Sequence, residues 1–253
     1  MQASALGSRP MPLIVCGVGA QCMAANVVSL AEWRMQLHTD YSLRVVVRPE
    51  DVAWSASPEP GVDRRRLERD GDEVARATSI VRYAPGSRFA AHTHGGGEEI
   101  LVLEGVFSDE HGDYPAGTYL RNPIGTRHTP FSEPGTTLLV KLRQFDAADT
   151  TTLRLNTQSI PAQAGTAAGV TVYPLHQHGS EIVRLLRFAP GASSTVTVAS
   201  GGEEILVLEG QLSDQFGDYP AGTWLRNPAG GVYTRHTAQG CLLYTKVGHL
   251  PQP

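Results

Sequence analysis

Hydrophobic and polar residues alternate along most of the chain in short stretches separated by turn residues. Residues 44–48 (RVVVR) form a β-branched run, residues 73–83 alternate loosely, and strand-like and turn-like stretches then follow each other up to residue 145. β-Branched and alternating runs favour strands, whereas Gly, Pro and Asp clusters favour turns. A helical period is approached only at residues 27–36. We therefore predict an all-β protein of short strands.

The second half of the chain repeats the first. Residues 98–123, EEILVLEGVFSDEHGDYPAGTYLRNP, return at 203–228 as EEILVLEGQLSDQFGDYPAGTWLRNP with five substitutions. RYAPG at 82–86 likewise matches RFAPG at 187–191, and LERDGDE at 67–73 matches LHQHGSE at 175–181. A repeat of this length, built from short strands, suits a small barrel or jelly roll that closes its own edges. We expect two tandem barrels, in residues 40–148 and 149–253, with residues 146–168 as a linker or a crossing strand.

Residues 1–39 are expected to be a poorly ordered extension that need not belong to the native chain, with Met35 as an alternative start. Met11 to Ala31 is free of charge, like a secretory h-region, but it contains Gly, Gln and Asn and follows no basic cluster. The three cysteines form no CxxC pair, so they indicate neither a disulfide framework nor a cysteine zinc site. We expect a cytoplasmic protein without a membrane segment.

The net charge of -4 provides no basic surface, which argues against a nucleic-acid partner. A small molecule is the expected partner, and a homodimer is left open.

One stretch combines metal-ligating residue types at a suggestive spacing. His92 and His94 alternate on a strand and so project to the same side. The glycines at 95–97 then turn the chain, Glu98 opens the returning strand, and His128 follows a Pro- and Gly-containing turn. Three imidazoles and a carboxylate suit zinc and first-row transition metals. We predict one divalent metal on these four side chains, iron or zinc foremost, with manganese or nickel as alternatives.

At this point the chain resembles the cupin superfamily, whose motifs are G(x)5HxH(x)3-4E(x)6G and G(x)5PxG(x)2H. The first motif matches at its histidines, Glu98 and Gly105, and the second matches at Gly117, Pro123, Gly125 and His128, although a terminal Asn is not found. The phrases GGGEEILVLEG and GDYPAGTYLRNP further resemble the ChrR-type cupins. The resemblance implies two double-stranded β-helix (RmlC-like jelly-roll) barrels, of which the first binds metal.

The second repeat is expected to be degenerate. It keeps Glu203, but Thr197 and Ala199 stand where the numbering places His92 and His94, and His236 is displaced by three residues. Too few ligands remain for a tight transition-metal site.

Residues that recur in the degenerate repeat are interpreted as structural, in turns or between the barrels. They are Glu104, Asp109, Asp113, Tyr114, Arg121 and Asn122. Tyr119 becomes Trp224 and is the candidate for lining the substrate pocket, whereas His111 is interpreted as a solvated hairpin residue. Glu99 alternates away from Glu98, so we do not assign it as a ligand. His176 and His178 form a second HxH that is interpreted as a solvated turn.

Two functions are consistent with these residues. The first is a non-haem metal-dependent dioxygenase-like enzyme that acts on a small diketone or phenolic ketone, because three His and one Glu leave coordination positions open. The alternative is a ChrR-like zinc-binding sensory or regulatory module without turnover. Residues 1–40 lack the helical zinc domain of an anti-sigma factor, which argues against direct sigma-factor inhibition. The sequence identifies no catalytic side chain.

Overall fold

The computed structural model describes residues 35–251, which lie within one compact unit, and it confirms the all-β prediction. The predictions made for residues 1–34 lie outside the described residues. Two short 3-10 helices, η1 (Pro49–Asp51) and η2 (Thr157–Ser159), interrupt the strands. Within residues 35–251, no helix has the length and apolar character needed to cross a membrane.

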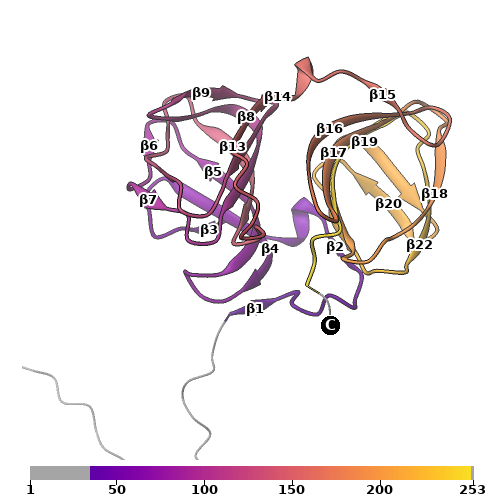
Figure 1. Ribbon diagram of the computed structural model, residues 1–253, viewed down its shortest axis with the longest axis horizontal. Helices are drawn as coiled ribbons and strands as arrows, with labels where there is room; N and C mark the ends of the chain where they lie inside the picture. The colour runs from indigo at the N-terminus through magenta and orange to yellow at the C-terminus, as the bar shows by residue number, and fades with distance from the viewer. Residues whose placement is uncertain (1–34, 252–253) are drawn as a thin grey trace, which may run out of the picture. The chain divides into compact units, whose positions relative to one another are not determined.

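The chain forms two β-barrels that follow each other in the sequence (Figure 1). The first barrel contains β1 (Gln36–Leu37), β3 (Ser55–Ala56), β4 (Val62–Asp70), β5 (Arg76–Tyr83), β6 (Ser87–Arg88), β7 (His92–Thr93), β8 (Glu98–Asp109), β9 (Gly112–Pro115), β10 (Thr118–Asn122), β11 (Arg127–His128), β12 (Phe131–Ser132) and β13 (Thr136–Leu142). The second contains β15 (Gln163–Ala164), β16 (Val170–His178), β17 (Glu181–Phe188), β18 (Ser193–Thr197), β19 (Glu203–Asp214), β20 (Gly217–Pro220), β21 (Trp224–Asn227), β22 (Val232–His236) and β23 (Cys241–Val247).

The two barrels exchange one strand each. The RVVVR run forms β2 (Val45–Val47), which pairs with β21 of the second barrel. Reciprocally, β14 (Leu153–Asn156), from the segment between the repeats, pairs with β10 of the first barrel. The segment at 146–168 therefore contributes a crossing strand, and β2 does not belong to the first barrel as the run at 44–48 had suggested. The residues at 35–39, assigned to the extension, include β1, which pairs with β4.

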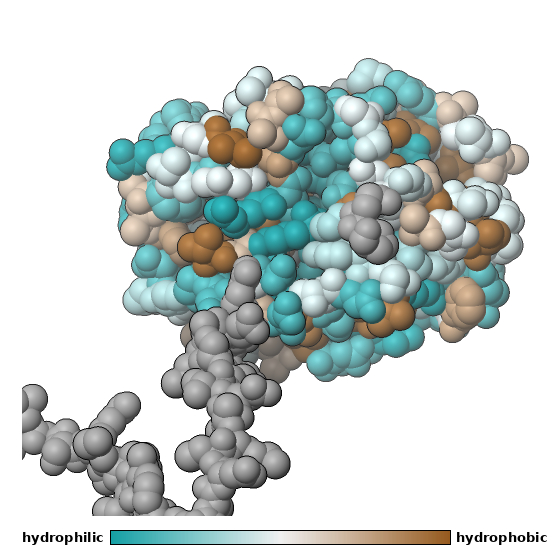
Figure 2. All heavy atoms as spheres, turned by 60° about the horizontal axis from the view of Figure 1, so that its bottom comes forward, coloured by the Kyte–Doolittle hydropathy of each residue, from teal (hydrophilic) through white to brown (hydrophobic). Residues whose placement is uncertain are grey.

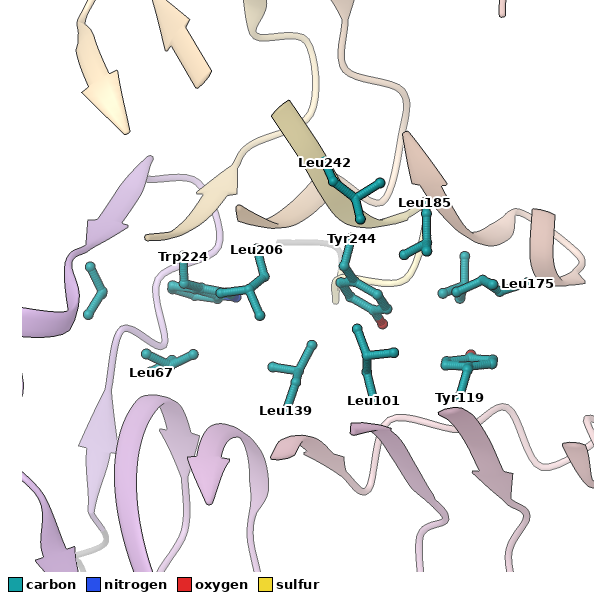
Figure 3. Packing of buried hydrophobic residues seen from close by; sticks show 12 residues of the cluster. Leu67, Leu101, Tyr119, Leu139, Leu175, Leu185, Leu206, Trp224, Leu242 and Tyr244 are labelled. Atoms are coloured by element: carbon teal, nitrogen blue, oxygen red, sulfur yellow. The ribbon is translucent and has the colours of Figure 1, made fainter. Parts of the chain in front are cut away.

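Strand alternation separates an inward from an outward face in each barrel. The interior of the first barrel is an apolar cluster that includes Ile100, Val102, Phe107, Leu120 and Leu138. An equivalent cluster fills the second barrel. The outward-facing residues of the same strands form a third cluster between the barrels, where Leu67, Leu101, Tyr119 and Leu139 meet Leu206, Trp224 and Tyr244 (Figure 3).

Buried ion pairs cross this contact reciprocally. Lys246 of the second barrel lies 2.6 Å from Glu99 of the first, and Lys141 of the first pairs with Glu204 of the second. Arg121 joins Glu99, Glu181 and Asp149 at 3.1, 2.9 and 2.6 Å. The interpretation of Arg121 as a contact between the barrels is therefore confirmed. On the outer face shown in Figure 2, hydrophobic residues are scattered among polar ones and form no large patch.

Candidate metal centre

The structure brings His92, His94, Glu98 and His128 together, and we call these four residues the ligand set. One potential ligand atom from each lies within 4.8 Å of the others. The imidazole centroids are 4.7 to 5.1 Å apart, and the Glu98 Oε2 atom is 3.2 Å from His94 Nε2 and 3.4 Å from His128 Nε2. They converge because β7 pairs with β11, which places His92 directly opposite His128.

The glycine turn before Glu98 has no room for side chains. A Cβ atom on Gly96 would lie 2.7 Å from the Arg143 side chain, and one on Gly97 would lie 2.3 Å from the Phe145 ring. Gly97 also has a φ of +78°, which side-chain-bearing residues rarely adopt. The tight turn returns the chain so that the Glu98 carboxylate reaches His94, which directly follows β7.

Each histidine of the ligand set has its Nδ1 atom committed to a neighbour. His92 Nδ1 lies 2.9 Å from the Ala90 carbonyl, and His128 Nδ1 lies 3.2 Å from an Asp109 carboxylate oxygen. His94 Nδ1 lies 2.9 Å from the Thr126 hydroxyl, which itself donates to the Pro123 carbonyl at 2.7 Å. These oxygens accept the Nδ1 protons, so all three Nε2 lone pairs remain available for a cation.

The four side chains themselves indicate a metal ion, without reference to any protein family. The Nε2 atoms of His94 and His128 are buried and form no hydrogen bond with another residue among 35–251; each instead lies near Glu98 Oε2, at 3.2 and 3.4 Å. Buried polar atoms are normally satisfied, so two of them directed at one carboxylate indicate a bound cation.

Electrostatics favour the ligand-competent protonation states. Burial opposes ionisation of Glu98, but the adjacent His94 and His128 and a 3.0 Å hydrogen bond from Asn122 lower its pKa to about 2. Burial lowers the pKa of His92, which favours the neutral imidazole. The site therefore offers an ionised carboxylate at Glu98 and favours the neutral imidazole at His92.

Two residues that support the site were interpreted as purely structural from the sequence. Asp109 orients His128, and Asn122 holds Glu98. Burial opposes ionisation of Asp109, but hydrogen bonds from His128, the His111 backbone N–H and Tyr114 lower its pKa. No sequence signal separated these residues, because both recur in the second repeat. Thr126 had a weak signal, since it lies inside the second motif.

Tyr119 lies away from the ligand set. Its side chain is fully buried in the cluster between the barrels, and its neighbour Leu120 points into the first barrel instead. This position differs from the prediction that Tyr119 lines the substrate pocket, because the alternation of β10 turns it to the outward face. A cavity of about 880 Å³ also opens between the barrels, lined by Trp54, Arg65 and Leu103 among others, and no member of the ligand set lines it.

The second barrel replaces the metal site with an ion pair. One extra residue in its glycine turn shifts the register, so β18 presents Val196 opposite Tyr233, as β7 presents His92 opposite His128. Val198 takes the backbone contacts of His94. Val196 and Val198, rather than Thr197 and Ala199, therefore occupy the two histidine positions. Glu203, the counterpart of Glu98, is neutralised by the Arg235 guanidinium, and His236 is exposed.

A second group of potential metal ligands is already paired with a protein cation, the Arg121 guanidinium. The group consists of Asp149, His176 and Glu181. His176 Nε2 lies 2.7 Å from Asp149, and the Arg121 guanidinium bridges Asp149 and Glu181. His176 is therefore a partly buried member of the contact between the barrels and not the solvated turn residue that the sequence suggested. His178 lies 3.9 Å from Asp146.

Comparison with known proteins gives one family and a common fold. The family model for the ChrR Cupin-like domain matches residues 42–146 and again residues 150–251. No curated protein matches the sequence significantly.

Solved structures share the architecture at low identity. A provisionally assigned dioxygenase from Nostoc punctiforme is 16% identical, with a TM-score of 0.69 over 84% of this chain and 85% of that chain. The pirin YhhW from Escherichia coli, solved with nickel(II), is 14% identical, with a TM-score of 0.62 over 83% of this chain and 100% of that chain. Bacillus subtilis oxalate decarboxylase, which has Mn(II) centres, is 12% identical, with a TM-score of 0.57 over 82% of this chain and 78% of that chain. These similarities show the fold alone.

Proposed function

We propose, from the premise that this chain belongs to the family of ChrR cupin-like domains, that its first barrel is a metal-dependent, oxygenase-like enzyme. The observation that carries the proposal is the convergence of three supported histidines and one ionised glutamate, with two buried Nε2 atoms directed at the Glu98 carboxylate. Four protein ligands leave one or two positions of a five- or six-coordinate ion for other molecules.

The ligand set would hold one divalent transition metal. Imidazole and carboxylate donors suit iron or zinc and also accept manganese or nickel. The nickel and manganese in two structures of similar fold support this range. When bound, the metal would act as a Lewis acid that polarises the oxygens of a substrate.

The protein's own residues define the rest of the site. Ala90, Thr126 and Asp109 fix the three imidazole planes, so the donors are in place before a substrate arrives. The interior beyond Glu98 is lined by Ile100, Val102 and other apolar side chains, which exclude water and suit an organic body. A small diketone or phenolic ketone, which presents oxygens at one end, matches this arrangement.

Metal analysis of protein purified without added metal tests the proposal. We expect about one transition-metal ion per chain in the wild type and a large loss in His92→Ala and His94→Ala. His236→Ala, which removes the exposed histidine of the second barrel, is the matched control and should keep the metal. Metal content that survives the double loss of His92 and His94 contradicts the site.

Oxygen consumption tests turnover. Protein loaded with ferrous iron should consume dioxygen with at least one diketone or phenolic ketone, and His92→Ala should not. A protein that binds zinc tightly and consumes no oxygen with any of these compounds favours the sensory alternative, which the relation to ChrR-type domains supports.

A further inference from the structure

The inward face of β4 carries arginines on the wall of the first barrel. In the strand register, Arg64 pairs with Val81, Arg66 with Ser79 and Arg69 with Ala77. Directly paired residues of antiparallel strands share a face, and Val81 belongs to the core of the first barrel. The three arginines therefore face the interior that also contains the ligand set.

Arg69 lies in the same cross-strand row as Glu98. Ala77 pairs with Leu142 of β13, and Leu142 pairs with Glu98 of β8. Three strand spacings, about 14 Å along the sheet, separate the two backbones. Because the sheet curves around the interior and the arginine side chain is long, a small organic molecule can reach from the ligand set to the guanidinium.

Arg69 is a buried cation that forms no ion pair among residues 35–251. Its exposed fraction is 2%, and its Nε donates to the Gly71 carbonyl at 3.0 Å. Burial and the charge of Arg64 lower its pKa, and the charge of Glu73 opposes them. Arg66 Nη1 donates to the Ser55 hydroxyl at 2.8 Å, but its buried Nε has no partner. The Arg64 guanidinium pairs with the exposed carboxylate of Glu73, at 3.3 Å. A buried guanidinium is costly unless an anion satisfies it.

The second barrel has lost these arginines together with the histidines. By the register of β16 with β17, Val172, Pro174 and Gln177 occupy the positions of the three arginines. The small residues Ala77 and Ser79, which leave space beside the arginines, become Ile182 and Arg184. If the arginines were purely structural, nothing would require their loss together with the ligand set. If the arginines and the ligand set bind the same molecule, their joint loss is expected.

We propose that Arg64, Arg66 and Arg69 form an anion subsite that binds the carboxylate of the substrate, while other oxygens of the same molecule reach the ligand set. The guanidinium fork matches a planar carboxylate, and the apolar wall accommodates the carbon skeleton between the two ends. This inference rests on the proposed function and narrows its substrate class to organic acids.

Two matched probes separate the two ends of the site. In 3,4-dihydroxybenzoate and 3,4-dihydroxybenzamide, the vicinal oxygens seek the metal, and only the first compound carries a carboxylate. Titration of ferric-loaded protein, followed by the charge-transfer absorption of the catechol, should show roughly 10- to 100-fold tighter binding of the acid, as expected for charge-assisted hydrogen bonds. An acid that binds no tighter than the amide, or binding of neither compound, overturns the subsite.

Variants then assign the preference to the arginines. Arg69→Gln and Arg64→Val introduce the residues that the second barrel has at these positions, Gln177 and Val172. Each variant should lower the acid-to-amide affinity ratio toward one. Amide binding and metal content should stay unchanged. Arg88→Gln, at an arginine whose side chain is 64% exposed, should keep the wild-type ratio. A ratio that survives both inward substitutions overturns the assignment. Protein that binds no metal but still prefers the acid, by calorimetry, overturns the proposed function and leaves the subsite standing.

Discussion

The hydroxyl of Thr126 shows how one atom can fix a metal ligand. It donates to the Pro123 carbonyl and therefore has its lone pairs free to accept the Nδ1 proton of His94. The imidazole is thereby held in the tautomer whose Nε2 faces Glu98. Loss of such a supporting contact typically lowers metal affinity about 10- to 100-fold.

Replacing Thr126 with valine should weaken metal binding roughly 10- to 100-fold, because the shape is kept and the acceptor is lost. Competition with a chelator of known affinity measures this change. Thr126→Ser restores the hydroxyl and should remain close to wild type. Unchanged affinity in the valine variant would mean that the strand pairing of β7 alone orients His94.

In the second barrel, the Arg235 guanidinium neutralises Glu203, as a metal ion would neutralise Glu98 in the first. Arg235→Met should destabilise the protein by about 3–5 kcal/mol, because it leaves the Glu203 carboxylate buried and unpaired. Urea unfolding measures the loss, and the added substitution Glu203→Gln should recover much of it. Metal content should stay at the wild-type level in both variants. A single variant as stable as the wild type would show that water reaches Glu203.

At this scale the sequence predicts the convergence of the four candidate side chains well and their surroundings poorly. The spacing of His92, His94 and Glu98 around a glycine turn constrains three side chains through local geometry alone. Asp109 reaches the site from the far end of β8 and Asn122 reaches it from β10, so their use depends on tertiary register. The same register places Val196, one residue before the position that numbering suggests, at the histidine site.

Among the elements, the exchanged strands β2 and β14 make each barrel depend on the other for one of its strands. β2 adds an edge to the second barrel and β14 adds one to the first. The β-branched run at 44–48 predicted a strand, whereas the composition of residues 146–168 left a linker and a crossing strand as alternatives. Neither pattern predicted the strand partners, since the pairing of an edge strand depends on the path of the connecting chain.

Isolated residues 42–146 should not behave as a monomeric barrel. This fragment lacks β14, leaves β2 without β21, and uncovers outward-facing residues such as Leu101 and Leu139. We expect it to self-associate or remain unfolded, as light scattering and circular dichroism would show. By contrast, the full chain cut between η2 and β15 should still elute as one species. A stable, monomeric first half would contradict an obligatory exchange.

Over the whole molecule, buried charge connects the two barrels. Burial opposes ionisation of Glu99, but the charges of Lys246 and Arg121 outweigh it, and the pKa is lowered to about 2. Because the folded-state pKa lies below that of the unfolded chain, this carboxylate stabilises the fold fully above about pH 4.5. The contribution is lost as the pH falls toward 2.

We therefore expect the urea midpoint of the wild type to fall between pH 5 and pH 2.5. Glu99→Gln should lower the midpoint at pH 6 and flatten its decline in acid, since the titrating group is gone. Glu104→Gln, at an exposed position on the same strand, should change neither. A wild-type midpoint that is constant down to pH 2.5 would contradict the assigned ion pairs.

The strand exchange also sets an order of events during synthesis. Val45 pairs with Arg226, which lies 226 − 45 = 181 residues later in the chain. At about 5–20 residues per second, the first strand leaves the ribosome roughly 10–40 s before its partner exists. In that interval β2 is an unsatisfied β-branched edge, open to pairing with a neighbouring nascent chain. Translation speed across the second half should therefore influence the yield of correctly closed molecules.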